Sequence, residues 1–161
     1  MPLSFFYYSR KAAVLIFILI SGCAVNSIDK GRSKDTNISA PNLNAAYNKA
    51  YTVFGVTYYP LKTAVGYSET GYASWYGAES GNTTAMGTYF NPNKMTAAHK
   101  TLPLPSRVRV TNLQNGQQIV VIVNDRGPFK HGRIIDLSRG AAKKIGLQGV
   151  AKVKVEYVGL N

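Results

Sequence analysis

The chain has 161 residues, of which 45% are hydrophobic, and its formal net charge is +12 because 19 Lys and Arg stand against seven Asp and Glu. This length accommodates one folded domain and a flanking segment, and the single cysteine excludes an intramolecular disulfide. So large a basic excess suits a polyanionic partner, either nucleic acid or an anionic surface outside the cytoplasm. A solvated basic face with no specific partner is the alternative.

The start of the chain has the pattern of a bacterial export signal. Arg10 and Lys11 precede a wholly apolar run over residues 12–20, and small residues then lead to Cys23. The run is shorter than the ~20 residues that span a bilayer, so we interpret residues 1–22 as a cleaved signal peptide. The Ile-Ser-Gly-Cys sequence that ends at Cys23 resembles the lipobox of bacterial lipoproteins, which implies that its thiol carries diacylglycerol and its amine is acylated. An ordinary secretory signal that happens to contain a cysteine is the alternative.

Export determines which partners this basic chain can meet. Nucleic acid lies in the wrong compartment, so we expect no nucleic-acid partner; lipid head groups and the carboxylates of peptidoglycan stem peptides remain. A lipidated Cys23 tethers the protein to a membrane. Ala24 favours the outer membrane, facing the periplasm, in a Gram-negative cell, because lipoproteins retained at the inner membrane usually carry Asp at this position. We expect the protein to be a monomer.

Residues 23–66 are predicted to form a lipid-anchored tether with a short β segment. Asn, Ser, Lys and Ala dominate residues 24–50 and large apolar side chains are few, which is typical of a flexible linker. Residues 51–61 are rich in β-branched and aromatic side chains, which predicts a short strand or hairpin. The folded domain is assigned to residues 67–161.

The pattern of residues 67–161 predicts a mainly β fold. Asn115-Gly116 separates two apolar segments and indicates a hairpin, because both residues tolerate positive φ. Ser138 is placed to cap a short helix that ends at Gly146. Strands are expected at 72–76, 107–113, 117–124, 133–137 and 150–158. About six strands with one or two short helices fit a small closed barrel.

Five sequence blocks resemble, in their order, those of the rare lipoprotein A family. The blocks are Gly71–Gly77, Thr84–Gly87, Met95–Pro103, Val108–Leu113 and Asn124–Phe129. The resemblance implies a six-stranded double-psi β-barrel that acts as a lytic transglycosylase in cell-wall remodelling. Such an enzyme cleaves peptidoglycan strands between N-acetylmuramic acid and N-acetylglucosamine and leaves 1,6-anhydromuramoyl ends. We expect no cofactor, and no metal site, because no cluster of ligating side chains has the required spacing.

Asp125 is the first candidate for catalysis. It follows an apolar strand, lies in a loop fixed by Gly127 and Pro128, and matches the aspartate that the family resemblance makes catalytic. In a lytic transglycosylase the C6 hydroxyl of the muramoyl sugar replaces water, so one carboxyl group can act first as acid and then as base. An Asx turn or an ion pair with Arg126 is the alternative role. The other carboxylates of the domain are Glu69, Glu79, Asp136 and Glu156.

Further candidates flank Asp125 in the family pattern. Asp136 resembles the aspartate of expansins, which loosen walls without cleaving glycans; a capping or barrel-stabilising carboxylate is its alternative role. His99, expected in a loop, resembles the family's active-site histidine, which orients a sugar or the aspartate, although a lone histidine is often structural. Arg126 and Trp75 are expected to bind substrate, and strand alternation places either Trp75 or its neighbour Tyr76 in the core.

Thr88 marks a departure from the family pattern. After Thr-Ala-X-Gly the family carries a glutamate implicated in catalysis, whereas this chain has Thr88, which donates a hydrogen bond but does not titrate near neutral pH. We expect Thr88 to contact substrate, with Asp125 sufficient for catalysis or Glu79 as a substitute. The alternative function is a catalytically weakened or inactive lipoprotein that binds glycans or loosens the wall.

We expect Cys23→Ser to leave an uncut or soluble product, because the thiol that would accept diacylglycerol is lost. Membrane fractionation followed by mass spectrometry of the amino terminus measures this. A processed variant that still fractionates with membranes would contradict lipidation at Cys23.

Overall fold

The computed structural model describes residues 38–77, 79 and 81–160. The predicted signal peptide and Cys23 lie outside these residues. Within the described part of the chain, no helix is both long enough and apolar enough to cross a bilayer.

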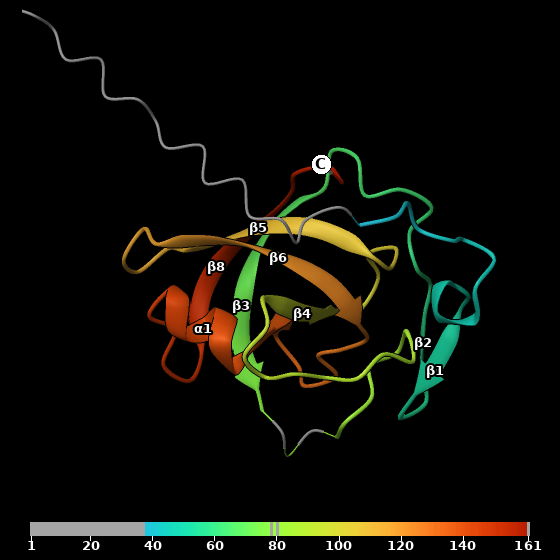
Figure 1. Ribbon diagram of the computed structural model, residues 1–161, viewed down its shortest axis with the longest axis horizontal. Coiled ribbons are helices and arrows are strands. Elements are labelled where there is room, and N and C mark those ends of the chain that lie inside the picture. Colours follow the sequence, from blue (N-terminus) through green and yellow to red (C-terminus); the bar gives the residue numbers. More distant parts are fainter. Residues whose placement is uncertain (1–37, 78, 80, 161) are drawn as a thin grey trace, which may run out of the picture. The chain divides into compact units, whose positions relative to one another are not determined.

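Six strands form a closed barrel in the order β3-β7-β4-β6-β5-β8 (Figure 1). The strands are β3 (Ser68–Tyr76), β4 (Thr96–His99), β5 (Ser106–Asn112), β6 (Gln118–Asp125), β7 (Arg133–Ser138) and β8 (Ala151–Tyr157). The pairs β3–β7 and β4–β6 are parallel, and all other neighbours are antiparallel. The predicted mainly β, six-stranded barrel is confirmed, and its sheet is mixed.

Local sequence signals determine several of these elements. The turn at Asn115-Gly116 joins β5 to β6, and Gly116 adopts a φ of 72° as the hairpin requires. Ser138 accepts a hydrogen bond from the Ala141 N–H at 3.2 Å, which caps the start of α1 (Arg139–Lys144). Helix α1 packs against β3, β6 and β7, where it closes one end of the barrel (Figure 1).

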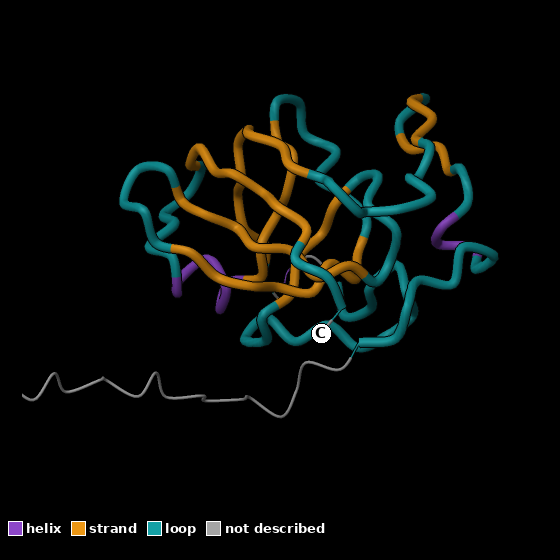
Figure 2. The backbone as a smooth tube through the Cα atoms, turned by 90° about the horizontal axis from the view of Figure 1, so that it is seen from above, coloured by secondary structure: helices purple, strands orange, loops and turns teal. Residues whose placement is uncertain are grey.

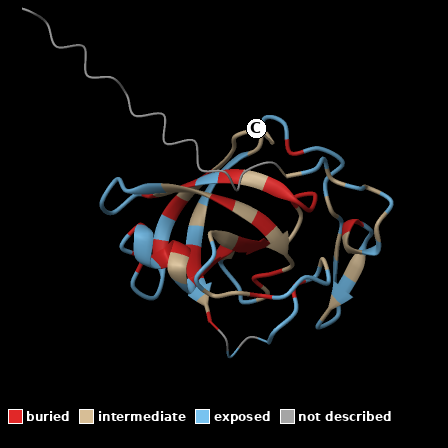
Figure 3. Ribbon diagram, viewed as in Figure 1, coloured by how far each residue is buried: buried red, intermediate tan, exposed pale blue. Residues whose placement is uncertain are grey.

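The hydrophobic core fills the barrel interior (Figure 3). Successive side chains of a strand point to opposite faces of the sheet, so alternate residues of β5 and β8 are buried. The largest fully buried side chains include Leu102, Leu104, Ile135, Leu137 and Ile145. The outward-facing residues that alternate with them are therefore held in position by the closely packed barrel.

Strand β4 differs from the prediction that His99 lies in a loop. The strand has only four residues and two of them are alanine, which is depleted in strands, so neither periodicity nor composition reveals it. Its extended conformation is imposed by its neighbours, since β4 pairs with β6 on one side and with β7 on the other.

Part of the predicted tether packs on the barrel. The short turn η1 (Ala46–Asn48) precedes a hairpin of β1 (Tyr51–Val53) and β2 (Val56–Tyr58), which corresponds to the predicted β segment and lies beside the barrel wall (Figure 2). The buried Asn48 side chain donates to the Leu104 carbonyl and accepts from the Leu104 N–H, both at 2.8 Å. The division of the chain at residue 67 stays a prediction, but the residues before it contact the barrel.

We expect Asn48→Ala to lower the free energy of unfolding by about 1–3 kcal/mol, because it leaves the buried Leu104 N–H without its acceptor. Urea denaturation measures the change. Asn44→Ala, at an exposed position of the same segment, is the matched control and is expected to change stability little. Equal stability of the two variants would contradict a structural role for Asn48.

Candidate functional site

The barrel register brings Asp125 and Asp136 into one row across adjacent strands. Ala98 of β4 pairs with Asp125 of β6 on one side and with Asp136 of β7 on the other, and Asp136 in turn pairs with Ser74 of β3. Neighbouring strands are ~4.8 Å apart, so the Cα atoms of the two aspartates are separated by roughly 10 Å. Residues that are 11 positions apart in the sequence are thus placed on either side of one small alanine side chain.

Both carboxylates line a surface groove of about 300 Å³, called here the carboxylate groove. Its wall also includes Tyr76 from β3, the loop that follows Asp125, and Phe54 from the tip of the β1–β2 hairpin. The complete lining is Phe54, Tyr76, Ala98, Asp125, Arg126, Gly127, Pro128, Phe129, Lys130, Arg133 and Asp136. Two acids, aromatic rings and cations therefore converge on one cleft, which suits a polar ligand with ring-shaped apolar faces.

Asp125 is held by backbone hydrogen bonds to one of its two oxygens. Its Oδ1 accepts the Ala85 N–H at 2.7 Å and the Arg126 N–H at 2.8 Å. Burial raises the pKa of Asp125, while those two hydrogen bonds and the Arg126 charge act in the opposite direction. Because Oδ1 is occupied by both donors, Oδ2 is the oxygen that is able to carry an acidic proton toward a ligand.

Asp136 is buried and only partly satisfied. Its Oδ2 lies 3.1 Å from Nη2 of Arg133, and burial raises its pKa in spite of that cation. Its Oδ1 has no hydrogen-bond partner among the described residues, and the same holds for a second buried atom of the groove, Nε of Arg133. Buried polar atoms are nearly always paired, so this cluster is suited to the hydroxyl and amide groups of a bound ligand.

Arg126 contacts the carboxylate groove, but its guanidinium is committed to protein carbonyl groups. Nε and Nη2 donate to the Tyr47 carbonyl, and Nη2 also donates to Oδ1 of Asn48. Nη1 donates to the carbonyl oxygens of His99, Lys100 and Leu102, the last at 2.6 Å. Every guanidinium nitrogen is thus used within the fold, and the geometry favours a structural role over direct binding of substrate.

His99 does not line the carboxylate groove. The residue is 3% exposed, and its Nδ1 accepts the N–H groups of Thr101 and Leu102 at 3.1 and 2.9 Å. Nδ1 therefore carries no proton, which assigns the proton to Nε2, 2.8 Å from the Tyr67 hydroxyl. Burial lowers the pKa of His99 to about 3, so the ring is neutral at physiological pH and positions the loop that accepts hydrogen bonds from Arg126.

Thr88 lies in an exposed turn that reaches Asp125 through its backbone. The Thr88 and Thr84 hydroxyls are 2.8 Å apart, and the Thr88 N–H donates to the Thr84 hydroxyl oxygen. The neighbouring Ala85 supplies the N–H that binds Asp125. This turn therefore borders the catalytic candidate, although the Thr88 side chain is not part of the groove lining.

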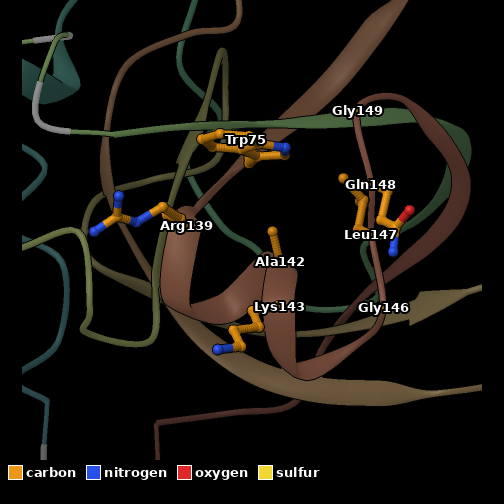
Figure 4. A pocket seen from close by; sticks show the side chains of 8 residues that line it. All are labelled: Trp75, Arg139, Ala142, Lys143, Gly146, Leu147, Gln148 and Gly149. Carbon is orange, nitrogen blue, oxygen red and sulfur yellow. The ribbon is translucent and has the colours of Figure 1, made fainter.

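Trp75 lies in a different cavity. It lines a space of about 380 Å³ beside α1, called here the indole cavity, together with Arg139, Lys143 and residues 146–149 (Figure 4). Its neighbour Tyr76 points into the carboxylate groove and stacks on Phe90, with ring centroids 4.7 Å apart. The strand alternation thus divides the two aromatic side chains between two sites.

Phe54 is a groove residue that the sequence does not single out. It is 90% exposed and adopts a φ of 49° at the hairpin tip, where Gly55 completes the turn. The only local signal for this hairpin tip is an aromatic residue immediately before a glycine, between two segments rich in strand-forming residues. Its approach to Asp125 depends on how the hairpin docks, which no local pattern reports.

Comparisons with known proteins show which family the chain resembles. Residues 68–157 match the family described as lytic transglycolase. The protein named endolytic peptidoglycan transglycosylase RlpA from Neisseria meningitidis serogroup B is 44% identical over 146 residues, which cover 89% of this chain and 61% of that protein. The protein of the same name from Rickettsia felis is 45% identical, covering 92% and 73%, and the one from Pseudomonas aeruginosa PAO1 is 52% identical, covering 81% and 39%.

The chain therefore spans about three fifths of the length of the Neisseria relative and less of the Pseudomonas relative. Among solved structures, Streptomyces papain inhibitor (SPI) is 27% identical with a TM-score of 0.47, covering 58% of this chain and 96% of its own.

We expect Asp125→Asn to stabilise the fold at neutral pH. The pKa of Asp125 is raised in the folded state, which means that folding favours the protonated carboxyl. The contribution of this carboxyl to the free energy of unfolding is therefore fully present at pH values below the ordinary aspartate pKa of about 3.9, and it is lost as the pH rises through the raised pKa. Asparagine keeps the Oδ1 acceptor without the ionisation. The melting temperature should exceed that of the wild type at pH 7 and equal it at pH 3; a variant less stable at pH 7 would contradict the burial cost.

Proposed function

The chain belongs to the RlpA family of lytic transglycosylases, and from this premise we propose that it cleaves peptidoglycan glycan strands in the carboxylate groove. The proposed bond lies between N-acetylmuramic acid and N-acetylglucosamine, and the proposed product ends are 1,6-anhydromuramoyl. The observation that carries the proposal is the placement of two half-buried or buried carboxylates, both with raised pKa values, on one groove.

Asp125 is proposed as the acid and base of the reaction. Its protonated carboxyl donates the Oδ2 proton to the glycosidic oxygen while the bond from the muramoyl C1 to that oxygen breaks. The muramoyl C6 oxygen then bonds to C1, and its proton passes to the Asp125 carboxylate, which restores the starting state. A raised pKa supports the first step, because more of the carboxyl is protonated at a given pH than in an ordinary aspartate.

Asp136 is proposed to assist from the opposite side of Ala98. Its unpaired Oδ1 is available to accept a sugar hydroxyl or amide hydrogen, and its ion pair with Arg133 restrains the side chain. A negative charge at this position favours the positive charge that develops at C1 in an oxocarbenium-like transition state. His99 and Arg126 are proposed to position the loops of the groove, and Thr88 to border the substrate.

The cellular setting is proposed from the sequence. Residues 1–22 act as a signal peptide, lipidated Cys23 anchors the chain to a membrane, and residues 67–161 form the domain that meets peptidoglycan in the cell envelope. The packed segment before residue 67 shortens the reach of the tether, because Asn48 binds the barrel.

A glycan-binding or wall-loosening protein is the second candidate function. Thr88 favours it, because a threonine stands where the family pattern carries a glutamate. In that case the carboxylate groove holds a glycan strand through the same unpaired polar atoms but does not cleave it.

We expect Asp125→Asn to reduce the release of anhydro-muropeptides from purified peptidoglycan by ~10² to 10⁴-fold, the usual effect of removing a general acid or base. Mass spectrometry of the soluble products measures the release. Glu156→Gln is the matched control, since Glu156 pairs with Lys154 on β8 outside the groove. Undiminished release by Asp125→Asn would overturn the assignment of Asp125.

Thr88→Glu separates the two candidate functions, because it adds the carboxylate of the family pattern. Anhydro ends from the wild type support the enzyme. If anhydro ends appear only with Thr88→Glu, the natural protein is a glycan-binding protein derived from an inactive lyase. If both forms bind glycan strands and leave them intact, the result supports the glycan-binding function.

A further inference from the structure

The β1–β2 hairpin is separate from the barrel sheet (Figure 1), yet its tip lines the carboxylate groove. Val53 pairs with Val56, so Phe54 and Gly55 are the two residues of a tight hairpin loop. Both have a positive φ, 49° and 77°, as a type I′ turn requires. The first position of such a turn favours asparagine, aspartate or glycine, so the turn itself does not account for a phenylalanine there.

Phe54 contributes little to the described fold. A bulky side chain at a φ of 49° is strained, because the left-handed conformation brings its Cβ close to a backbone carbonyl oxygen. The side chain is also 90% exposed, so most of its apolar surface stays in water and gains nothing from packing. The ring is therefore open to contact with a ligand in the groove.

The hairpin holds Phe54 at a defined place beside the groove. Tyr51 and Tyr58 stack across its two strands with ring centroids 5.3 Å apart, and Phe129 of the groove wall contacts both rings. The Tyr51 hydroxyl donates to the Lys100 carbonyl oxygen at 2.8 Å. Because an anchored hairpin presents Phe54, less conformational entropy is lost when a ligand packs against it than with a free loop.

The carboxylate groove is suited to a ligand that has an apolar face and a polar rim. Phe54 and Phe129 supply aromatic surface on one part of the lining. Within the described residues, Oδ1 of Asp136 lacks a donor and Nε of Arg133 lacks an acceptor. A pyranose ring meets all three conditions, because its C–H groups form a face that packs on an aromatic ring while hydroxyl and amide groups surround its edge.

We propose that Phe54 is a substrate-binding residue whose ring stacks on a sugar of the glycan strand in the carboxylate groove. The hairpin tip thereby determines where the strand lies relative to Asp125 and Asp136. The identity of the ligand rests on the proposed function, which takes a peptidoglycan glycan strand as the substrate. The segment before the barrel then supplies a residue that contacts this strand.

Binding to uncleaved strands tests the proposal without requiring catalysis. Soluble glycan strands from purified peptidoglycan are titrated into protein that carries Asp125→Asn, which keeps the strands intact, and calorimetry gives the dissociation constant. In this background we expect Phe54→Ala to weaken binding by ~3- to 10-fold, the range of one aromatic stacking contact. Phe54→Tyr should restore the affinity, whereas Phe54→Leu, which is apolar but has no ring, should not.

Tyr59→Ala is the matched control. Tyr59 is a 71% exposed aromatic residue just after β2 that does not line the groove, so its removal should leave strand binding unchanged. Phe54→Asn tests the fold separately, since asparagine tolerates the left-handed conformation. This variant should melt at the same temperature as the parent protein or higher, and should bind strands as weakly as Phe54→Ala does. A lower melting temperature would assign Phe54 to the fold and overturn the proposal.

The remaining outcomes also decide the proposal. Equal affinity of Phe54→Ala and its parent, or an equal loss with Tyr59→Ala, would overturn it. Weaker binding of Phe54→Ala to phosphatidylglycerol vesicles with unchanged binding to strands would assign the ring to a membrane surface instead. The proposed enzyme fails separately: a wild type that releases no anhydro ends, combined with weaker strand binding by Phe54→Ala, disproves the enzyme and keeps the role of Phe54. Release of anhydro ends with no effect of Phe54→Ala on binding does the reverse.

Discussion

The guanidinium of Arg126 is the interaction on which the arrangement of the carboxylate groove depends. A partly buried cation is costly unless its donors are satisfied, and here the acceptors are carbonyl oxygens and one amide oxygen from separate segments. They come from Tyr47 and Asn48 before the barrel and from the loop after β4. The Arg126 N–H also donates to Asp125, so the same residue that joins these segments fixes the proposed acid.

Docking of the β1–β2 hairpin follows from this network. The Arg126 guanidinium lies 5.7 Å from the centroid of the Tyr51 ring, and the Tyr51 hydroxyl donates to the Lys100 carbonyl at 2.8 Å. Tyr51 stacks on Tyr58 across the hairpin, and Phe129 of the groove contacts both rings. The exposed Phe54 at the hairpin tip is thereby carried to the groove, which makes the segment before the barrel part of the site.

Sequence reasoning was most successful where the cause of a structure is local. The β5–β6 turn follows from Asn115-Gly116 and the start of α1 from Ser138, since each depends on a few neighbouring residues. The partners of Arg126 could not be predicted, because Tyr47 lies 79 positions and Leu102 24 positions away along the chain. Asp125 was selected as the candidate acid from its position after an apolar strand and from family resemblance, whereas its relation to Asp136 needs the register through Ala98.

The two faces of β7 differ in polarity. Facing the barrel, Ile135 and Leu137 are fully buried and apolar, as stability requires. Facing the groove, Oδ1 of Asp136 has no hydrogen-bond partner among the described residues, and an unpaired buried acceptor costs free energy. A polar ligand bound in the groove recovers part of that cost, which agrees with the function proposed for the groove.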